Sequence, residues 1–351
     1  MDRQAFEALR AKPEPVILAI ESSCDETSAA VVAGRTVKSL AISSQIEIHR
    51  RFGGVVPEVA SRNHTLAVND VTEQALTEAN LGFSDLDAVA VTYGAGLAGA
   101  LLVGVTYAKT VAMALDIPLI AVDHIKGHVA ANYLHSDLTP PFVCLIVSGG
   151  HTVLCEVRDY DDFRLLGTTL DDAAGEAFDK VARCLGLPYP GGPEIDRLAR
   201  EGKPSFALPR MLKQEHDLNF SYSGLKTAVI NLLHTAQQRG EEVNKADLCA
   251  SFQAAALDVL VEKSMQACRR TGLKKLAVAG GVSANSYLRE HLRAAAAKAG
   301  VRLFIPPALY CTDNAAMIGA EAGCLLAKGQ GLADETLTAQ PSLRLRFGEN
   351  T

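Results

Sequence analysis

The chain lacks several features by which common classes of protein are recognised. Its eight cysteines form no C-x-x-C pair, which argues against a zinc ribbon, a thioredoxin-like site or a disulfide framework and favours reduced thiols in the cytoplasm. Basic residues are not in excess, since the net charge is −6. Any contact with nucleic acid should therefore use local patches or a partner's surface. The first residues contain no apolar h-region, so no signal peptide is expected.

Membrane and nucleotide signatures are missing as well. The most apolar stretch, Gly94 to Leu115, is interrupted by Lys109 and rich in glycine, which is typical of a tightly packed buried helix rather than a membrane span. The chain has no G-x-x-x-x-G-K-[ST] motif and no G-x-G-x-x-G after its first apolar run. P-loop and Rossmann interpretations therefore lack their signatures.

What the chain does have is three glycine-rich turns at the borders of expected strands and helices. They are SGGHT from Ser148, YPGGPEID from Tyr189 and AGGVSAN from Ala279. Glycine lets backbone N–H groups approach an anion closely, and a helix N-terminus adds further donors. The three turns leave open both a phosphate-bearing ligand and a purely structural role.

The length and the hydrophobic pattern predict two α/β domains, because 351 residues exceed what one core usually serves. Two strands joined by a polar turn are predicted over residues 16–32, and the pattern recurs over residues 141–157. This recurrence suggests an internal duplication. Later strands alternate with helices, which indicates α/β layers. Residues 1–15 are expected to form a helical or loose extension, and residues 199–225 an irregular insertion.

Acidic residues gather at two places. Asp25 and Glu26 lie in the tip of the first hairpin. Asp172, Glu176 and Asp179 follow i, i+4, i+7 spacing, so they could share one helix face. Such a face is either solvated surface or, beside glycine turns, a site for ribose hydroxyls or a nucleophile.

His124 and His128 are four residues apart in HIKGH. On a helix this spacing permits one metal to bind both imidazoles, although two structural histidines remain the alternative. Ile125 follows His124, so the glutamate base of H-E-x-x-H proteases is missing. Spacing names no third ligand; Asp313 and Asn314 look like helix-capping residues. Cys24 is expected to be a small buried residue.

Eight segments taken together resemble one family, and they cover the chain from about residue 16 to residue 347. They are IESSCDETSAAVV, GGVVPEVASRNH, HIKGH, LIVSGGHT, DDAAGEAFDKVARCLGLPYPGGP, FSYSGLKTA, AGGVSAN and CTDNAAMIG. This ordered set is similar to that of the bacterial tRNA threonylcarbamoyl transferases, formerly called O-sialoglycoprotein endopeptidases.

The resemblance implies an α/β fold of the actin/hexokinase-like (ASKHA) type, with two lobes, duplicated mixed sheets and helices around a nucleotide cleft. Residues 16–123 with 314–347 would form lobe I, and residues 124–313 lobe II. The implied reaction transfers a threonylcarbamoyl group from threonylcarbamoyl-AMP to N6 of the adenosine 3′ of the anticodon, in tRNAs that read codons beginning with A.

The resemblance also implies roles for individual residues. His124, His128 and Asp313 match ligands of one iron or zinc ion, which for Asp313 replaces the capping interpretation. The carboxylates of Asp25 and Glu26 match residues tied to activity. Substrate contacts are implied for Ile146, Val147, Ser148, Gly149, Gly150, Asp179, Gly192, Asp196 and Asn285. Lys126 departs from relatives, which often carry an acidic residue there.

The implied partners are a tRNA anticodon loop, a paralogous inactive actin-like subunit and a small ATPase, with no membrane, and ATP or ADP is a further candidate ligand of the cleft. Two other functions stay open. One is a metal-dependent glycoprotease, and the other is a non-catalytic nucleotide-binding scaffold of the actin-like class.

Overall fold

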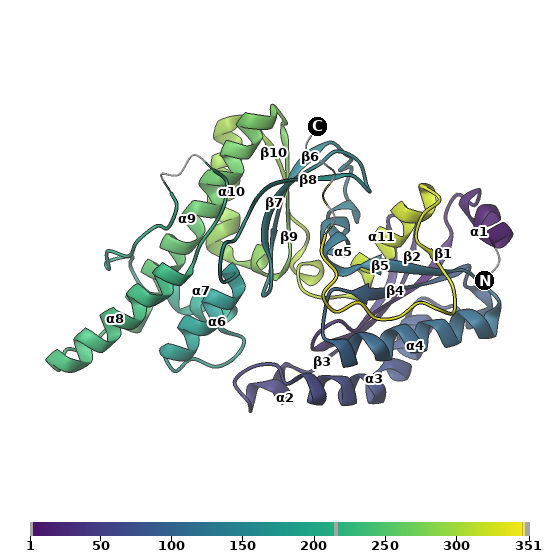
Figure 1. Ribbon diagram of the computed structural model, residues 1–351, viewed down its shortest axis with the longest axis horizontal. Coiled ribbons are helices and arrows are strands. Elements are labelled where there is room, and N and C mark those ends of the chain that lie inside the picture. Colours follow the sequence, from purple (N-terminus) through teal and green to yellow (C-terminus); the bar gives the residue numbers. More distant parts are fainter. Residues whose placement is uncertain (1–2, 214–216, 346, 348–351) are drawn as a thin grey trace. The chain divides into compact units, whose positions relative to one another are not determined.

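A computed structural model describes residues 3–213, 217–345 and 347. The chain divides into two compact units (Figure 1). Unit 1 contains residues 3–139 and 312–345, and unit 2 contains residues 140–213, 217–311 and 347. Residues 1–2 of the expected extension, 214–216 of the expected insertion and 346 of the expected first lobe lie outside the described residues.

Unit 1 is built on a mixed six-stranded sheet with the order β11-β5-β4-β1-β2-β3. Its strands are β1 (Val16–Glu21), β2 (Glu26–Ala33), β3 (Thr36–Ser44), β4 (Ala88–Gly94), β5 (Leu119–Asp123) and β11 (Leu332–Ala333). Its helices are α1 (Arg3–Arg10), α2 (Ile46–Arg50), α3 (Pro57–Glu78), α4 (Ala98–Leu115), α5 (His124–Ala130) and α11 (Ala315–Ala327), with short 3₁₀ turns at Phe83–Asp85 and Ala131–Tyr133. The hairpin β1–β2 is antiparallel, whereas β1, β4 and β5 run parallel.

Alternating residues of β1 face two helical layers. Leu18 and Ile20 belong to the core that the sheet shares with α3 and α4. On the opposite face α11 approaches so closely that a Cβ on Gly319 would lie 2.6 Å from Val32 Cγ2 and 3.4 Å from Ala19 Cβ. The strand is therefore apolar from Val16 to Ile20, as expected for a strand covered on both faces.

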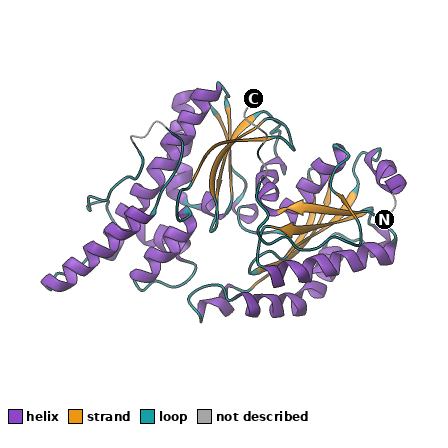
Figure 2. Cartoon of the chain, in the orientation of Figure 1, coloured by secondary structure: helices purple, strands orange, loops and turns teal. Residues whose placement is uncertain are grey.

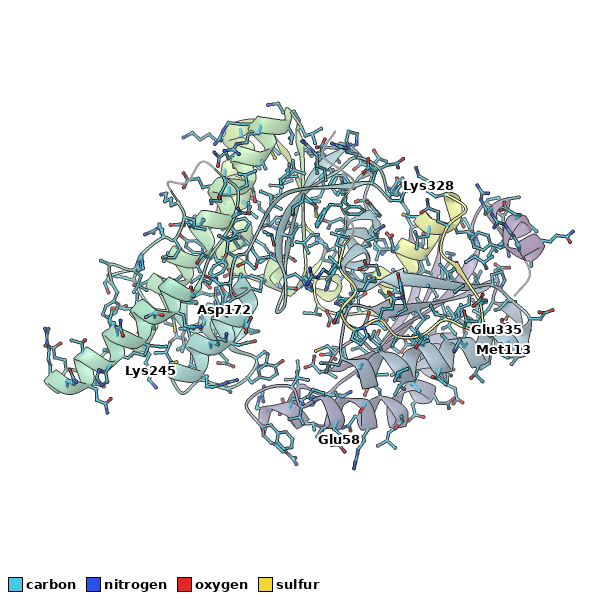
Figure 3. The ribbon with its side chains drawn as sticks, in the orientation of Figure 1. Glu58, Met113, Asp172, Lys245, Lys328 and Glu335 are labelled. Carbon is cyan, nitrogen blue, oxygen red and sulfur yellow. The ribbon has the colours of Figure 1, made fainter. Side chains whose placement is uncertain are left out.

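Helix α4 passes a membrane-span test by length and composition, with a mean hydropathy of 1.5. It nevertheless packs on the sheet of unit 1, since Val105, Ala108 and Ala112 are buried in the core shared with β1 and β4. Met113, labelled in Figure 3, is 62% exposed on its outer side. The packed helix predicted within Gly94–Leu115 is confirmed for Ala98–Leu115, although only one side of it is buried and Gly94 ends β4.

Unit 2 repeats the plan with a five-stranded sheet of order β10-β9-β6-β7-β8 (Figure 2). Its strands are β6 (Phe142–Val147), β7 (Thr152–Val157), β8 (Phe163–Thr168), β9 (Lys275–Ala279) and β10 (Arg302–Phe304). Its helices are α6 (Ala174–Cys184), α7 (Gly191–Ala199), α8 (Ser223–Arg239), α9 (Lys245–Thr271) and α10 (Ser286–Ala299), with 3₁₀ turns at Gly281–Ala284 and Ala308–Tyr310.

The two sheets share one topology. In each, an antiparallel three-strand meander is followed by two strands parallel to its first strand, and a helix connects those two. Hence β1-β2-β3-β4-β5 corresponds to β6-β7-β8-β9-β10, which confirms the predicted duplication and α/β layers.

The boundary between the units differs from the predicted one. Helix α5 and Asp313 fall in unit 1, not in the second lobe. The reason is packing of α5 on α11, where a Cβ on Gly127 would come within 2.8 Å of Ile318 Cδ1. The extension contributes helix α1, whose Phe6 and Leu9 are buried in unit 1. The irregular insertion expected over residues 199–225 is shorter, since α7 ends at Ala199 and α8 begins at Ser223, and the described residues between these helices contain no further helix or strand.

Candidate metal centre and substrate-binding turns

The histidine pair lies on α5, at the end of β5. Asp123 caps this helix, because its Oδ1 accepts hydrogen bonds from the backbone N–H groups of Ile125 (2.8 Å) and Lys126 (3.4 Å). The imidazole rings of His124 and His128 lie with centroids 4.6 Å apart at 76°. Both are buried, so the i, i+4 spacing does place them on one face.

Asp313 joins them from the start of α11. Its Oδ1 lies 3.5 Å from His124 Nε2 and 3.2 Å from His128 Nε2. Asn314, not Asp313, caps α11 by accepting a hydrogen bond from the backbone N–H of Met317 at 3.1 Å. The capping interpretation of Asp313 was therefore wrong. Among the described residues, these three form the one group of His, Cys, Asp or Glu side chains arranged to hold a metal ion.

The donor set fits a metal. Apart from the 3.2 Å approach of Asp313 to Nε2, neither ring nitrogen of His128 has a hydrogen-bond partner among the described residues, although the residue is 1% exposed. Histidine and carboxylate bonds of 2.0–2.2 Å in a tetrahedral zinc site would place ligand atoms about 3.4 Å apart. The two His–Asp distances, 3.5 and 3.2 Å, match this separation. Two imidazoles and one carboxylate suit zinc or iron and leave coordination positions for a substrate.

Two residues for which the sequence predicted no role, Glu21 and Ser23, contact Nδ1 of His124, the ring nitrogen that does not face Asp313. The Oε2 of Glu21 and the Oγ of Ser23 each lie 3.1 Å from His124 Nδ1. Burial disfavours the charged form of both His124 and Glu21, but the attraction between the opposite charges is larger than this effect. Glu21 and Asp313 therefore raise the pKa of His124 to about 9, and His124 lowers the pKa of Glu21. The only hint in the sequence is a glutamate closing an otherwise apolar strand.

Asp25 and Glu26, which we call the acidic turn, lie where the connection from β1 enters β2, in the same unit. Asp25 is 9% exposed, and burial and the charge of Asp313 both raise its pKa. Burial raises the pKa of Glu26 to about 8, despite a 2.8 Å hydrogen bond from Ser44 Oγ. Burial also raises the pKa of Cys24, which argues against a nucleophile there; the residue was expected to be buried and is half-buried.

The residues implied in adenylate binding lie at the end of β6 in unit 2. Ile146 and Val147 are fully buried, so their side chains support the turn rather than line its surface. Gly149 and Gly150 are exposed, and a Cβ on either would meet nothing within 4 Å. The space above their backbone is therefore open to a ligand.

Two of the three glycine turns come together there. Gly280 has φ +89°, and a Cβ on it would lie 2.5 Å from the carbonyl oxygen of Val147. The N–H of Gly175, at the start of α6, donates to the carbonyl of Ser148 at 3.2 Å. Only glycine fits these approaches, and they bring a helix N-terminus next to the Ser148 turn.

The other implied contacts have structural partners. Asp179 accepts from the N–H of Gly191 at 2.7 Å, at the start of α7. Asp196 accepts from Ser286 Oγ at 2.7 Å and from Arg200 at 3.0 Å. Asn285 caps α10 through Leu288 N and donates to Gln253 Oε1 at 2.7 Å. A Cβ on Gly192 would meet nothing within 4 Å.

The three carboxylates that could share one helix face do not all lie on a helix, because only Glu176 and Asp179 belong to α6. Asp172, labelled in Figure 3, precedes α6 and pairs with Lys180 (2.8 Å) and Lys226 (2.7 Å). Glu176 also pairs with Lys180 at 2.8 Å. Two of the three carboxylates are thus neutralised by lysines, and Asp179 binds the start of α7.

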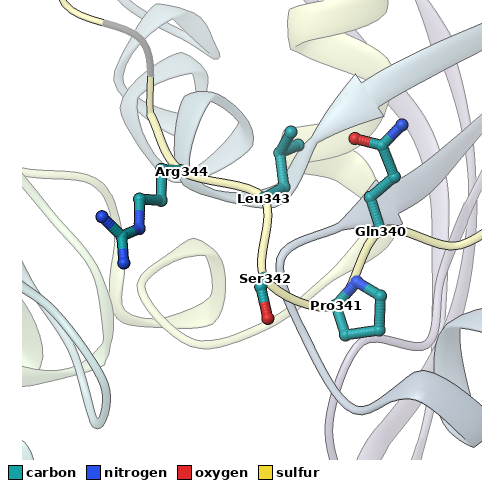
Figure 4. A pocket seen from close by; sticks show the side chains of 5 residues that line it. All are labelled: Gln340, Pro341, Ser342, Leu343 and Arg344. Atoms are coloured by element: carbon teal, nitrogen blue, oxygen red, sulfur yellow. The ribbon is translucent and has the colours of Figure 1, made fainter.

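The open pocket in Figure 4 lies elsewhere. It has a volume of about 500 Å³ and is lined by residues 340–344, none of which was predicted to be a site residue. This segment borders the β4–α4 loop, since Gln340 N donates to Tyr93 O at 2.7 Å and Gly96 N to Pro341 O at 3.1 Å. The same loop also contacts the residues that follow β1, since Leu97 N donates to Ser23 O at 2.7 Å.

Comparisons with known proteins agree with this geometry. Residues 36–320 match the family model of the tRNA N6-adenosine threonylcarbamoyltransferases. Proteins of that name from Clostridium perfringens (strain SM101 / Type A) and Clostridium beijerinckii are each 55% identical over 333 residues, which is 94% of this chain and 98% of theirs.

Solved structures with the same fold are more distant. Full-length HypF in its phosphate- and nucleotide-bound form superimposes with a TM-score of 0.59 at 14% identity, over 90% of this chain and 46% of HypF. Component A of the Acidaminococcus fermentans (R)-2-hydroxyglutaryl-CoA dehydratase gives 0.53 at 14% identity, over 89% and 99%. These likenesses confirm the actin/hexokinase-like fold. On the family match, the sequence identity and the fold, the chain belongs to the tRNA N6-adenosine threonylcarbamoyltransferase family.

Proposed function

We propose that this chain transfers the threonylcarbamoyl group of threonylcarbamoyl-AMP to N6 of the adenosine 3′ of the anticodon, in tRNAs that read codons beginning with A. The new bond joins N6 to the carbamoyl carbon, the bond from that carbon to the phosphate oxygen breaks, and AMP leaves. The observation that carries the proposal is the His124–His128–Asp313 cluster beside the acidic turn, in a chain of this family.

His124, His128 and Asp313 would hold one iron or zinc ion. Bound there, the metal would supply Lewis acidity and a template for substrate oxygens. Glu21 keeps Nε2 of His124 turned toward Asp313, since it occupies Nδ1.

The adenine amine is a weak nucleophile, so positioning and proton removal must supply much of the rate. A carboxylate of the acidic turn, Asp25 or Glu26, would accept the N6 proton. The raised pKa of each makes its ionised form a stronger base than an exposed carboxylate, and Glu26, with a pKa of about 8, would act in the fraction that is ionised. Gly149 and Gly150 are exposed residues, and their backbone N–H groups would bind the phosphate of the adenylate.

The net charge of −6 gives little general affinity for tRNA. We therefore include partners in the proposal: a paralogous inactive actin-like subunit and a small ATPase, acting in the cytoplasm on a splayed anticodon loop. ATP or ADP is a candidate further ligand.

The test is reconstitution with tRNA, threonine, bicarbonate, ATP and the partner proteins, followed by mass detection of the modified nucleoside. His124→Ala should abolish product, whereas His234→Ala, at an exposed position of α8, should not. Absence of product with wild-type protein, under conditions where a clostridial relative works, would refute the proposal. Peptide cleavage that a chelator inhibits would instead favour the glycoprotease. Unchanged tRNA modification in the His124→Ala variant would favour the non-catalytic scaffold.

A further inference from the structure

His64 is a buried residue of α3, and its side chain contacts the chain on both sides of the acidic turn. Its side chain has no exposed surface. Its Nε2 lies 3.0 Å from the carbonyl oxygen of Cys24, and its Nδ1 lies 2.7 Å from the Oγ1 of Thr27. Cys24 and Thr27 flank Asp25 and Glu26 on the chain. One imidazole ring therefore contacts both ends of the turn that carries the two carboxylates.

The partners determine the protonation of the ring. A carbonyl oxygen can only accept, so Nε2 must carry a proton and donate to Cys24. The Nδ1 then accepts from the hydroxyl of Thr27, and the amide Nε2 of Gln45 lies 3.5 Å from the same nitrogen. Burial lowers the pKa of His64. The ring is thus held as the neutral Nε2–H tautomer and is a poor proton carrier.

The rest of the 45–64 segment reinforces this contact. The backbone N–H of Gln45 donates to the carbonyl of Asp25 at 3.0 Å, and its side chain donates to Ala60 O at 3.3 Å. His49, also buried, accepts the N–H of Val56 at 3.3 Å just before α3 begins. The GGVVPEVASRNH motif, to which the sequence assigned no role, thereby forms the support of the acidic turn.

We propose that His64 is a positioning residue, whose two hydrogen bonds fix the Cys24–Thr27 turn and so keep the carboxylates of Asp25 and Glu26 beside Asp313. This inference rests on the proposed function, because it makes the turn part of the transfer site. A histidine that merely stabilises α3 against β2 would support folding without setting where the carboxylates lie.

Four variants separate these roles. His64→Leu removes both hydrogen bonds, His64→Gln retains an amide donor for Cys24 O, and Thr27→Val removes the hydroxyl alone. Asn63→Ala is the matched control, because Asn63 lies on the same helix and its side chain donates to Val59 O at 2.8 Å, within α3.

We expect His64→Leu to lower kcat for tRNA modification by about 10- to 100-fold, with KM for tRNA changed by less than about threefold, since a misplaced catalytic group affects the chemical step. His64→Gln should recover at least about a third of the lost activity on a logarithmic scale, and Asn63→Ala should match the wild type. The double variant with Thr27→Val should be no slower than His64→Leu, because both changes act through one turn. Zinc affinity, measured with a chromophoric chelator, should change by less than about threefold.

Hydrogen–deuterium exchange of the peptide covering residues 22–28 gives a readout that needs no activity. It should accelerate in His64→Leu and not in Asn63→Ala. If wild-type protein makes no product, the proposed function fails, and exchange alone still decides whether His64 holds the turn.

Unchanged exchange in His64→Leu, or kcat within twofold of wild type, would overturn the inference. The inference would also be overturned if activity fell only in proportion to Tm and the His64→Gln variant recovered none of it. If His64→Leu does not fold, Thr27→Val decides: a lower kcat at constant KM supports the inference, and an unchanged kcat overturns it.

Discussion

Glu21 and His124 lie 103 residues apart in the chain, yet the carboxylate of the first is 3.1 Å from Nδ1 of the second. Glu21 is fully buried and also accepts from Thr92 Oγ1 at 2.6 Å and from Ser23 N at 2.5 Å. The carboxylate therefore cannot easily move away from the ring. It orients His124 as carboxylates orient histidine ligands in metalloproteins.

Glu21→Gln should weaken metal binding without removing a ligand. The amide keeps the shape of the carboxylate but loses the negative charge that makes His124 a stronger ligand for the metal. We expect affinity for zinc to fall about 10- to 100-fold, as measured by competition with a chromophoric chelator. Glu78→Gln, at an exposed position of α3, should leave affinity unchanged; equal affinity of the Glu21 variant would contradict the orienting role.

Asp313→Asn should abolish both metal retention and tRNA modification. The substitution leaves the cap of α11 intact, because Asn314 provides it, so Tm of the metal-free protein should change little. Removing metal from wild-type protein with a chelator should have the same effect on activity. Adding back iron or zinc separately would then show which ion restores it, and an Asn variant that retains metal would refute the ligand assignment.

Glu26→Gln should stabilise the protein above neutral pH. The ordinary pKa of 4.5 applies to the unfolded chain, and the folded value is about 8. Between these values the folded state keeps a proton that the unfolded state has lost, so the wild type loses stability as pH rises. At about 1.4 kcal/mol per pKa unit, the loss is at most about 5 kcal/mol.

Thermal unfolding of both proteins from pH 4 to 9 measures this effect. The Tm advantage of the Gln variant should grow between pH 5 and 8 and then level off. A difference that does not vary with pH would show that Glu26 is not held protonated.

Gly94→Ala should destabilise unit 1. A Cβ there would lie 2.4 Å from Gln340 O and 2.7 Å from Leu343 Cβ, so the segment in Figure 4 would have to move away from the β4–α4 loop. We expect a cost of about 1–3 kcal/mol, as for overpacking elsewhere. Gly323→Ala on α11 is the matched control: its Cβ would meet only Gly34 O at 3.9 Å, and the helix should gain about 0.5–1 kcal/mol. Denaturant unfolding compares the two; equal effects would mean that the contact at Gly94 is unimportant.

Several features were determined by the sequence itself, because they depend on neighbours within a few residues. The β1–β2 and β6–β7 hairpins follow from apolar runs on either side of polar turns. The pairing of His124 with His128 follows from the pitch of one helical turn. The identity of the family likewise needed only ordered motifs, each local.

Tertiary structure decided how distant segments meet. Asp313 reaches the histidines because α11 packs against α5 and the sheet, and no periodicity within the CTDN motif records that contact. The same segment misled local reasoning, since both Asp313 and Asn314 suit a helix cap and only packing shows which one caps. Glu21 and His64 were missed for a related reason: a buried polar residue shows its purpose only through partners that the sheet order brings to it.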